Sequence, residues 1–243
     1  MKERNTLRLS HPQMKTFLNV AREDADALGD RITSLEAKAI FIRANFLKRG
    51  FDIVVSLLVL VLLVSWLYPL IALCIKLSSR GPVLFRQRRI GINGNIFNCY
   101  KFRTMRVMSQ NKYTPTEKND IRVTKVGKFL RKSNLDELPQ IINVLIGEMS
   151  IIGPRPHPIA FHNEYSKYIE NISLRLLVKP GITGLAQIKG YRGDVLNEEL
   201  NKKRTKMRVS LDLAYIQNWS VGFDVYIMYQ TVLQMVHRKT NAH

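Results

Sequence analysis

The chain is poor in cysteine and lacks the common nucleotide-binding loops. Of its 243 residues only Cys74 and Cys99 are cysteines, and they form no CxxC pair. This excludes a disulfide framework and a cysteine-rich zinc site, and it is typical of a protein in a reducing compartment. The five histidines show no HExxH spacing, and neither GxxxxGK[ST] nor GxGxxG occurs. An ordinary nucleoside triphosphatase and a dinucleotide-dependent enzyme are therefore not expected.

Acidic residues are also scarce relative to basic ones. The 19 Asp and Glu oppose 38 Lys and Arg, which leaves a formal net charge of +19. Such an excess favours an anionic partner: nucleic acid, an acidic membrane surface or a phosphorylated substrate. The apolar content of 46% is enough for one core of ordinary size, so we expect one catalytic domain. No apolar stretch follows the first basic residues, and no signal peptide is predicted.

The first 32 residues carry scattered charges, and we expect residues 1–32 to form a flexible leader. Thr33 and Glu36 then have the spacing of a capping box, which predicts a helix that begins at Thr33. Apolar residues recur along it at Leu35, Ala39, Ile42 and Phe46. This helix is amphipathic and could lie on a membrane surface.

Residues 53–74 are almost wholly apolar. At about 1.5 Å per residue, a helix of this length crosses a hydrocarbon core of about 30 Å. Pro69 removes a backbone donor and tends to bend the helix, and basic residues flank the run on both sides. Because neither flank is preferred on the cytoplasmic side, we favour a re-entrant helix that breaks near Ser65 and Pro69 and returns. A straight span and a buried helix of a soluble protein are the alternatives.

The rest of the chain is expected to form a small, helix-rich α/β domain at residues 81–237, after a membrane part at 33–80 and before a tail at 238–243. Residues 83–90 and 96–102 flank an Asn-Gly turn, which predicts a β-hairpin. Helices are predicted at 125–132 and 133–145, turns at 154–158 and 180–184, and amphipathic surface helices over 210–236.

Adjacent carboxylates at Asp136 and Glu137 form the first candidate site. They lie at an apolar helix start and follow Arg131 and Lys132. Here the helix dipole and the basic residues would keep a carboxylate ionised, able to attack phosphorus or to bind Mg²⁺. Alternatively, the pair only complements the helix dipole.

Basic residues held by turns form the second candidate site. Lys101 and Arg103 follow the hairpin, Arg155 lies between two prolines, and Arg192 lies between two glycines in the segment 190–193. A guanidinium binds phosphate through a planar fork, and a rigid backbone reduces the entropy lost on binding. Each could be a solvated surface residue, but together they indicate a diphosphate site.

Three segments together resemble one known family. KFRTM at 101–105, LRKSNLDELPQIINVLIGEMSIIGPRP at 130–156 and KPGITGLAQIKGYRG at 179–193 are similar to the bacterial sugar transferases, monotopic phosphoglycosyl transferases that begin lipid-linked glycan synthesis. The resemblance covers about residues 46–236. It implies a re-entrant membrane helix, a small cytosolic catalytic region and the cofactor Mg²⁺.

The resemblance also implies a two-step reaction. Asp136 would attack the sugar-linked phosphate of a UDP-sugar and release UMP, and undecaprenyl phosphate would then take the sugar phosphate from the aspartate. Glu137 would hold Mg²⁺ together with Asp136, Arg131 and Arg192 would position phosphates, and Asp212 would orient a basic partner. Splitting the exchange lets the nucleotide leave before the lipid phosphate approaches.

Further implications concern the substrate and the location. Residues 157–168 and 191–193 are most similar to the subgroup that transfers glucose-1-phosphate or galactose-1-phosphate from UDP-glucose or UDP-galactose, as in exopolysaccharide synthesis. The implied location is the bacterial inner membrane, with the catalytic domain facing the cytoplasm and in contact with membrane lipids. A homodimer is left open.

The sequence departs from the family pattern at Leu185, where Trp is frequent, and in the separation of Ser65 from Pro69. A multi-pass membrane domain is also missing from residues 1–45. Two rival functions are a membrane-attached nucleic-acid-binding protein, for which no recognition motif is found, and an inactive scaffold of a polysaccharide assembly complex. The intact residues that speak against the scaffold are Asp136, Glu137, Arg103 and Arg192.

Overall fold

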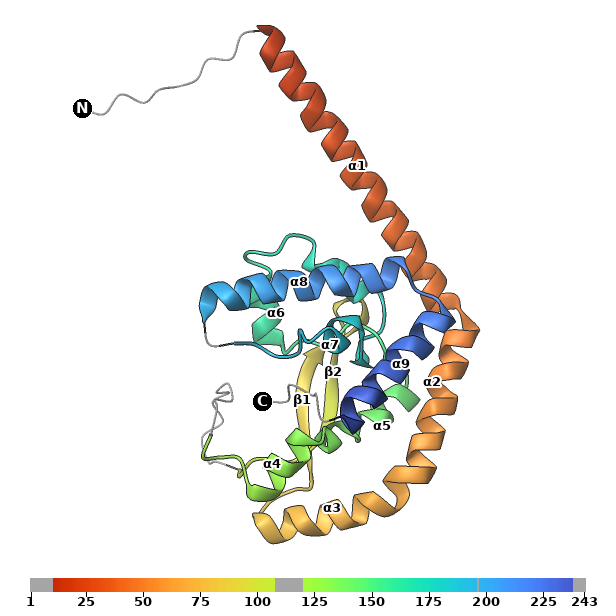
Figure 1. Cartoon of the computed structure of the whole chain (residues 1–243), viewed down its shortest axis with the longest axis vertical. Coiled ribbons are helices and arrows are strands. Elements are labelled where there is room, and N and C mark those ends of the chain that lie inside the picture. The colour runs from red at the N-terminus through yellow and green to blue at the C-terminus, as the bar shows by residue number, and fades with distance from the viewer. Residues whose placement is uncertain (1–10, 108–119, 196, 238–243) are drawn as a thin grey trace, which may run out of the picture.

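The computed structural model describes residues 11–107, 120–195 and 197–237, with residues 11–25 described by their backbone alone. Most of this part is helical, and in Figure 1 an arc of helices over residues 11–78 partly encloses the body that the later elements form. The longer helices are α1 (His11–Ala44), α2 (Phe46–Val59), α3 (Ser65–Ser78), α4 (Lys125–Lys132), α5 (Gln140–Leu145), α6 (Ile159–Tyr165), α8 (Glu198–Gln217) and α9 (Val221–Val236). Two small sheets complete the expected helix-rich α/β fold.

The first helix, α1, begins earlier than predicted. Its expected start at Thr33 is wrong, because this hydroxyl donates a hydrogen bond of 3.0 Å to the carbonyl of Gly29 inside the helix. Residues 11–32, expected as a leader, therefore belong to the same helix, whereas residues 1–10 lie outside the described part. Leu35, Ala39 and Ile42 are buried in the core, and the rest of α1 extends away from the body (Figure 1).

The apolar run forms α2 and α3, joined by the π-helical turn η1 (Leu60–Val64). Figure 1 shows that the chain changes direction here and that α3 curves under the body. Ser65 Oγ donates to the Val61 carbonyl at 2.6 Å, and Trp66 Nε1 donates to the Leu62 carbonyl at 2.7 Å. These side chains satisfy carbonyls of the irregular turn. The change of direction thus begins before Ser65, and Pro69 lies one turn further on, inside α3.

Both ends of this apolar segment contact the same body. Near the start of α2, Asp52 accepts hydrogen bonds from Ser150 Oγ at 2.8 Å and from the Ile151 amide at 2.9 Å. Near the end of α3, Ile71 and Ile75 pack in a cluster with Phe102 and Leu130. The most apolar 18-residue window of Phe46–Ser78 has a mean hydropathy of 2.7 and is only 11% buried, so this segment meets the length and composition of a membrane span.

The predicted hairpin is confirmed. Strands β1 (Leu84–Ile90) and β2 (Ile96–Phe102) pair antiparallel, and the short helical turn η2 (Ile92–Gly94) joins them. Asn93 and Gly94 both have positive φ, at 53° and 80°. These two residue types adopt that region at little cost, which is why the Asn-Gly pair gives the turn.

The predicted helix at 125–132 is confirmed as α4, but the second one at 133–145 is divided. Asn134 has a left-handed φ of 57° and ends the path of α4, and a 3₁₀ turn, η3 (Leu135–Glu137), follows. Pro139 then precedes α5, where its missing N–H costs no helical hydrogen bond. The two candidate carboxylates therefore lie on a short turn and not on a regular helix.

The expected turn at 180–184 is also wrong in part. Gly181–Thr183 forms strand β4, which pairs parallel with β3 (Ser150–Ile152). The 3₁₀ segment η4 (Ile172–Leu177) precedes it, and α7 (Leu185–Ile188) follows.

Two helices cover the C-terminal region where amphipathic helices were expected from residue 210. The first, α8, begins at Glu198, because the Asn197 side chain caps it. The second, α9, is capped by Ser220 and exposes an apolar face. That face consists of Val225, Tyr226, Tyr229, Val232, Met235 and Val236. The expected tail at 238–243 lies outside the described residues.

Candidate active site

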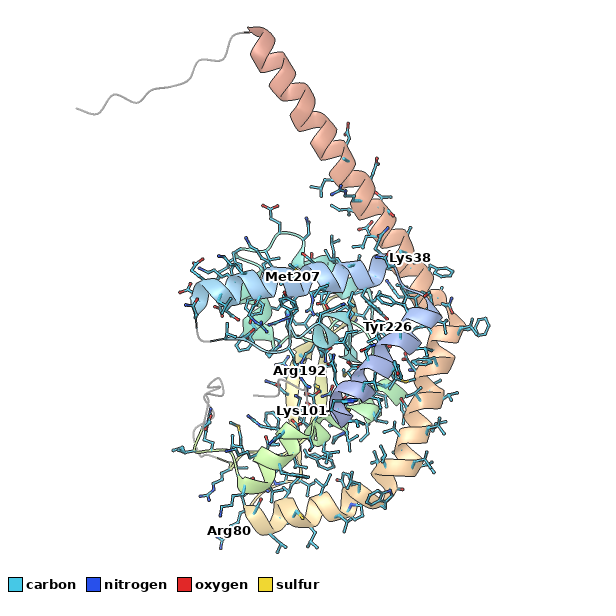
Figure 2. The ribbon with its side chains drawn as sticks, in the orientation of Figure 1. Lys38, Arg80, Lys101, Arg192, Met207 and Tyr226 are labelled. Carbon is cyan, nitrogen blue, oxygen red and sulfur yellow. The ribbon has the colours of Figure 1, made fainter. Side chains whose placement is uncertain are left out.

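Four elements that are distant in sequence bring one acidic and three basic side chains together. Glu137 lies on η3, Lys101 near the end of β2, Arg155 in the loop after β3, and Arg192 in the loop after α7. Lys101 and Arg192 lie close together in the middle of the body (Figure 2). Of the basic residues predicted to bind a diphosphate, these three converge on one carboxylate.

Glu137 is saturated by this cluster. Its Oε1 lies 2.8 Å from Lys101 Nζ and 2.5 Å from Arg155 Nη2, while its Oε2 lies 3.1 Å from Arg155 Nη1 and 3.1 Å from Arg192 Nη2. Arg155 thus binds the carboxylate with both arms of its guanidinium, the geometry that gives the strongest pairing. Burial alone would raise the pKa of Glu137, but Arg155, Lys101 and Arg192 outweigh it and hold the pKa well below its usual range.

The neighbouring carboxylate, Asp136, is not paired in this way. It is 9% exposed, and among the described residues its carboxylate accepts no hydrogen bond. Burial and then the negative charge of Glu137 raise the pKa of Asp136, against the opposite effects of Lys101, Arg192 and Arg131. The neighbouring cations therefore stabilise the charged form of Asp136, as expected, but by less than burial and Glu137 destabilise it. An unbound and destabilised carboxylate is a better nucleophile than a paired one.

Arg131 approaches the site from α4. Its Nε donates to Thr104 Oγ1 at 2.9 Å. Burial lowers the pKa of Arg131, while Asp136 opposes that shift. Gly127 permits this placement, because a Cβ at that position would lie only 1.9 Å from the Thr104 carbonyl oxygen. The close contact of α4 with Thr104 therefore depends on a glycine.

The loop that carries Arg192 is held from behind by Arg208 of α8. Arg208 Nε donates to the Tyr191 carbonyl at 3.0 Å, and its Nη2 donates to the Gly193 carbonyl at 2.7 Å. The same Nη2 pairs with Asp194 at 3.0 Å. Arg192 itself donates to the Asn134 side chain as well as to Glu137. The backbone on both sides of Arg192 is thus fixed by one buried guanidinium.

Asp212 lies behind Arg155 and does not contact the cluster directly. Its carboxylate pairs with Arg175 at 2.7 Å, with both side chains buried. Arg175 Nη2 in turn donates to the carbonyl of Arg155 at 2.6 Å. Asp212 therefore has the basic partner that the resemblance implies. Asp212 supports the backbone of Arg155 through Arg175 and lies behind the cluster that would bind a phosphate.

Arg103 is the candidate that the structure places elsewhere. Its guanidinium donates to the carbonyls of Ser79, at 2.8 Å, and of Arg80, at the end of α3. Ser79 is the C-cap of α3 and Arg80 follows it, so both carbonyls lie just beyond the helix. Arg103 thus fixes the chain where it leaves the apolar segment; backbone carbonyls occupy its two terminal nitrogens, while its buried Nε has no partner among the described residues.

Several positioning residues were missed by the sequence analysis. Arg208, Tyr165 and Asp194 form one chain of contacts, in which the Tyr165 hydroxyl donates to Asp194 at 2.6 Å. Asn143 was missed as well: it accepts from the Tyr100 amide at 3.0 Å and donates to the Asn98 carbonyl at 2.7 Å, which joins α5 to β2. A polar Asn within the apolar stretch QIINVL is a signal that could have been used.

The Mg²⁺ that the resemblance implies would have to be held by the two carboxylates, Asp136 and Glu137. The described residues contain no group of three His, Cys, Asp or Glu side chains that could hold an ion. Mg²⁺, however, commonly takes only one or two carboxylates together with substrate phosphates and water. Asp136 and Glu137 fit that donor set, provided that phosphates draw Arg155 and Arg192 away from Glu137.

The cluster as a whole suits a diphosphate. Four cations, Lys101, Arg131, Arg155 and Arg192, surround two carboxylates. A bacterial sugar transferase family profile matches residues 43–238. The chain belongs to this family.

The family includes relatives with named activities. One is the UDP-glucose:undecaprenyl-phosphate glucose-1-phosphate transferase of Escherichia coli, 53% identical over 191 residues that cover 78% of this chain and 40% of the relative. Another is the undecaprenyl-phosphate galactose phosphotransferase of Salmonella typhimurium, 37% identical over 82% of this chain and 42% of the relative. The Exopolysaccharide production protein PSS of Rhizobium leguminosarum is 41% identical over 79% of this chain and 96% of its own length. The chain spans about two fifths of the first two.

Proposed function

We propose that this protein transfers a hexose-1-phosphate from a UDP-sugar to undecaprenyl phosphate and releases UMP. The observation that carries the proposal is the pair of unlike carboxylates, with Glu137 saturated by three cations and Asp136 unbound beside it. The named activities of the E. coli and S. typhimurium relatives support this donor and acceptor. The sugar would be glucose or galactose.

In the first step, the diphosphate of the UDP-sugar takes the place of the Glu137 carboxylate as the partner of Arg155, Arg192 and Lys101. An oxygen of Asp136 attacks the phosphorus that bears the sugar. The bond from this phosphorus to the bridging oxygen breaks, and UMP leaves with the electron pair. The cations offset the charge that otherwise repels an anionic nucleophile from a diphosphate.

In the second step, an oxygen of undecaprenyl phosphate attacks the same phosphorus. The bond to Asp136 breaks, and the carboxylate is restored. One phosphoanhydride replaces another in the full reaction, so no further source of energy is required. Mg²⁺ held by Asp136 and Glu137 would supply additional neutralisation of the phosphate oxygens.

The lipid acceptor requires a site near a membrane. Both ends of Phe46–Ser78 contact the same body, so a membrane entered by this segment is also left on the same side. A re-entrant insertion with the body on the cytoplasmic face of the bacterial inner membrane accounts for this arrangement. The π-helical turn at Leu60–Val64 would then lie deepest in the bilayer, with its freed carbonyls satisfied by Ser65 and Trp66.

The decisive experiment measures UMP release by the purified full chain with undecaprenyl phosphate, Mg²⁺ and a panel of UDP-sugars. We expect release with UDP-glucose or UDP-galactose and its loss in Asp136→Asn. Lys203→Gln, an exposed change on α8, serves as the control. An active Asp136→Asn variant would refute the nucleophile. A chain that releases no UMP from any sugar would support the inactive scaffold instead.

A further inference from the structure

A second cationic site lies away from Asp136, in a cavity where α1 meets α2. The cavity opens between the end of α1, the first turn of α2 and the strand β3 with its neighbour Lys179. Four of its lining residues are basic: Arg43, Lys48, Arg49 and Lys179. None of them belongs to the active-site cluster.

Two carboxylates lie close to these cations, Asp52 in the cavity lining and Asp224 beside it, and both are already bound. Asp52 accepts from Ser150 and from the backbone of Ile151. Asp224 accepts from Lys48 Nζ at 2.8 Å and from the Tyr215 hydroxyl at 2.8 Å. Lys48 is thus neutralised within the core, between Asp224 and Asp52. Asp52 lines the cavity as its one carboxylate against four cations, and among the described residues Arg43, Arg49 and Lys179 form no ion pair.

Two of these cations converge on one point. A Cβ placed at Gly147 would lie 3.6 Å from Lys179 Nζ and 3.9 Å from Arg49 Nη2. Arg49 also donates to the carbonyls of Val144 and Leu145, whereas Lys179 Nζ has no hydrogen bond or ion pair among the described residues. Burial and the charge of Arg49 lower the pKa of Lys179, and Asp52 offsets this shift only in part. An anion bound between Lys179 and Arg49 would offset the repulsion between their positive charges.

The position of the cavity identifies the class of anion. It lies at the start of Phe46–Ser78, where Asn45 caps α2. Exposed apolar side chains surround this entry: Phe41, Phe46, Leu47 and Ile146. In a bilayer entered at Phe46, basic residues beside such side chains lie at the level of the lipid headgroups.

We propose that this cavity binds the phosphate of an anionic membrane phospholipid, with Lys179 and Arg43 as the free cations and Arg49 as the third. The proposal rests on the membrane insertion described above but not on the transferase chemistry. Arg49 connects the site to α5, whose first residue follows Glu137 by three positions. A bound headgroup would therefore fix the distance between the bilayer surface and η3, the turn that carries Asp136 and Glu137.

The test uses the full chain in a neutral detergent and measures its affinity for dihexanoylphosphatidylglycerol, a soluble anionic phospholipid. We expect Lys179→Gln to weaken binding about fivefold or more, since one cation near an anionic headgroup contributes about 1 kcal/mol. Arg43→Gln should act in the same direction, and the exposed Lys203→Gln should stay within about twofold of the unchanged chain. Equal affinity in Lys179→Gln and Lys203→Gln would overturn the proposal.

Two further ligands distinguish the source of the phosphate. If inorganic phosphate binds as tightly as the lipid and with the same dependence on Lys179, the site takes free phosphate and the headgroup assignment is wrong. If farnesyl phosphate, a phosphomonoester, binds far more tightly than the phospholipid, the site holds the acceptor instead. Retention of the chain in vesicles after a carbonate wash is measured separately, so failed insertion is not mistaken for an empty cavity.

Discussion

Replacement of Arg208 by lysine tests whether the clamp behind Arg192 positions the site. Lysine keeps the positive charge and can still pair with Asp194, but a single ammonium cannot reach the carbonyls of both Tyr191 and Gly193. A hydrogen bond from a charged group contributes about 1.5–3 kcal/mol, so the loss of one or two costs about 2–5 kcal/mol. For a chain of this size we expect Tm to fall by about 5–15 °C.

The effect on activity should exceed the effect of lower stability. A shift of Arg192 by about 1 Å would reduce turnover by about 10²-fold. UMP release is therefore measured at 20 °C, well below the lowered Tm, as a function of UDP-sugar concentration. We expect kcat/KM to fall by about 10- to 100-fold, with a clear rise in KM because Arg192 is proposed to bind the donor.

A destabilised control separates positioning from stability. Ile216 is fully buried in the main core, and Ile216→Ala should cost about 2–5 kcal/mol without touching the Arg192 loop. We expect this variant to lose Tm but to keep kcat/KM at 20 °C. The reasoning is refuted if Arg208→Lys retains the original KM and kcat, or if Ile216→Ala loses activity to the same extent.

Three other outcomes follow from the same geometry. Asp136→Asn should abolish UMP release yet raise Tm at neutral pH in a thermal melt. The reason is that it removes a buried carboxylate whose pKa is raised by burial, and a lower Tm would contradict this. Glu137 has a lowered pKa, so its stabilising effect is complete above about pH 4.5 and is lost as the pH falls through the pKa of the folded state. The difference in unfolding free energy from Glu137→Gln, measured by denaturant titration, should accordingly narrow in acid, and a constant difference would argue against the charge cluster. Cysteines placed at Arg49 and Arg80 should react with an impermeant thiol reagent from the same side of a sealed vesicle, whereas labelling from opposite sides would exclude the re-entrant insertion.

The elements that local signals determine were predicted well. The hairpin was predicted from Asn93 and Gly94, and the helix at 125–132 was predicted as a basic helix. The helix at 133–145 was misjudged, since the left-handed Asn134 and the position of Pro139 divide it. The start of α1 was misjudged because a capping-box spacing also occurs inside a continuous helix, where the hydroxyl bonds backward.

The candidate site was predicted in its centre and missed at its edges. Charge and turn signals mark Lys101, Arg155 and Arg192 in the sequence, and the structure brings these three side chains together at Glu137. Arg103 was assigned to the same group, but its partners are carbonyls some 20 residues earlier in the chain, which only the tertiary fold can place. Arg208 was missed for the same reason, as a guanidinium that binds backbone carbonyls has no distinctive sequence signal.

The arrangement of Lys101 and Arg103 sets how far the reaction can lie from the bilayer. One binds the carboxylate of the catalytic turn, and the other binds the carbonyls at the exit of the apolar helix. Their backbones are two residues apart, which spans about 7 Å of extended chain. Under re-entrant insertion, this short tether keeps the phosphorus chemistry at headgroup height. In the proposed reaction, the lipid phosphate then needs no extraction from its bilayer, while the water-soluble nucleotide sugar must travel to the surface.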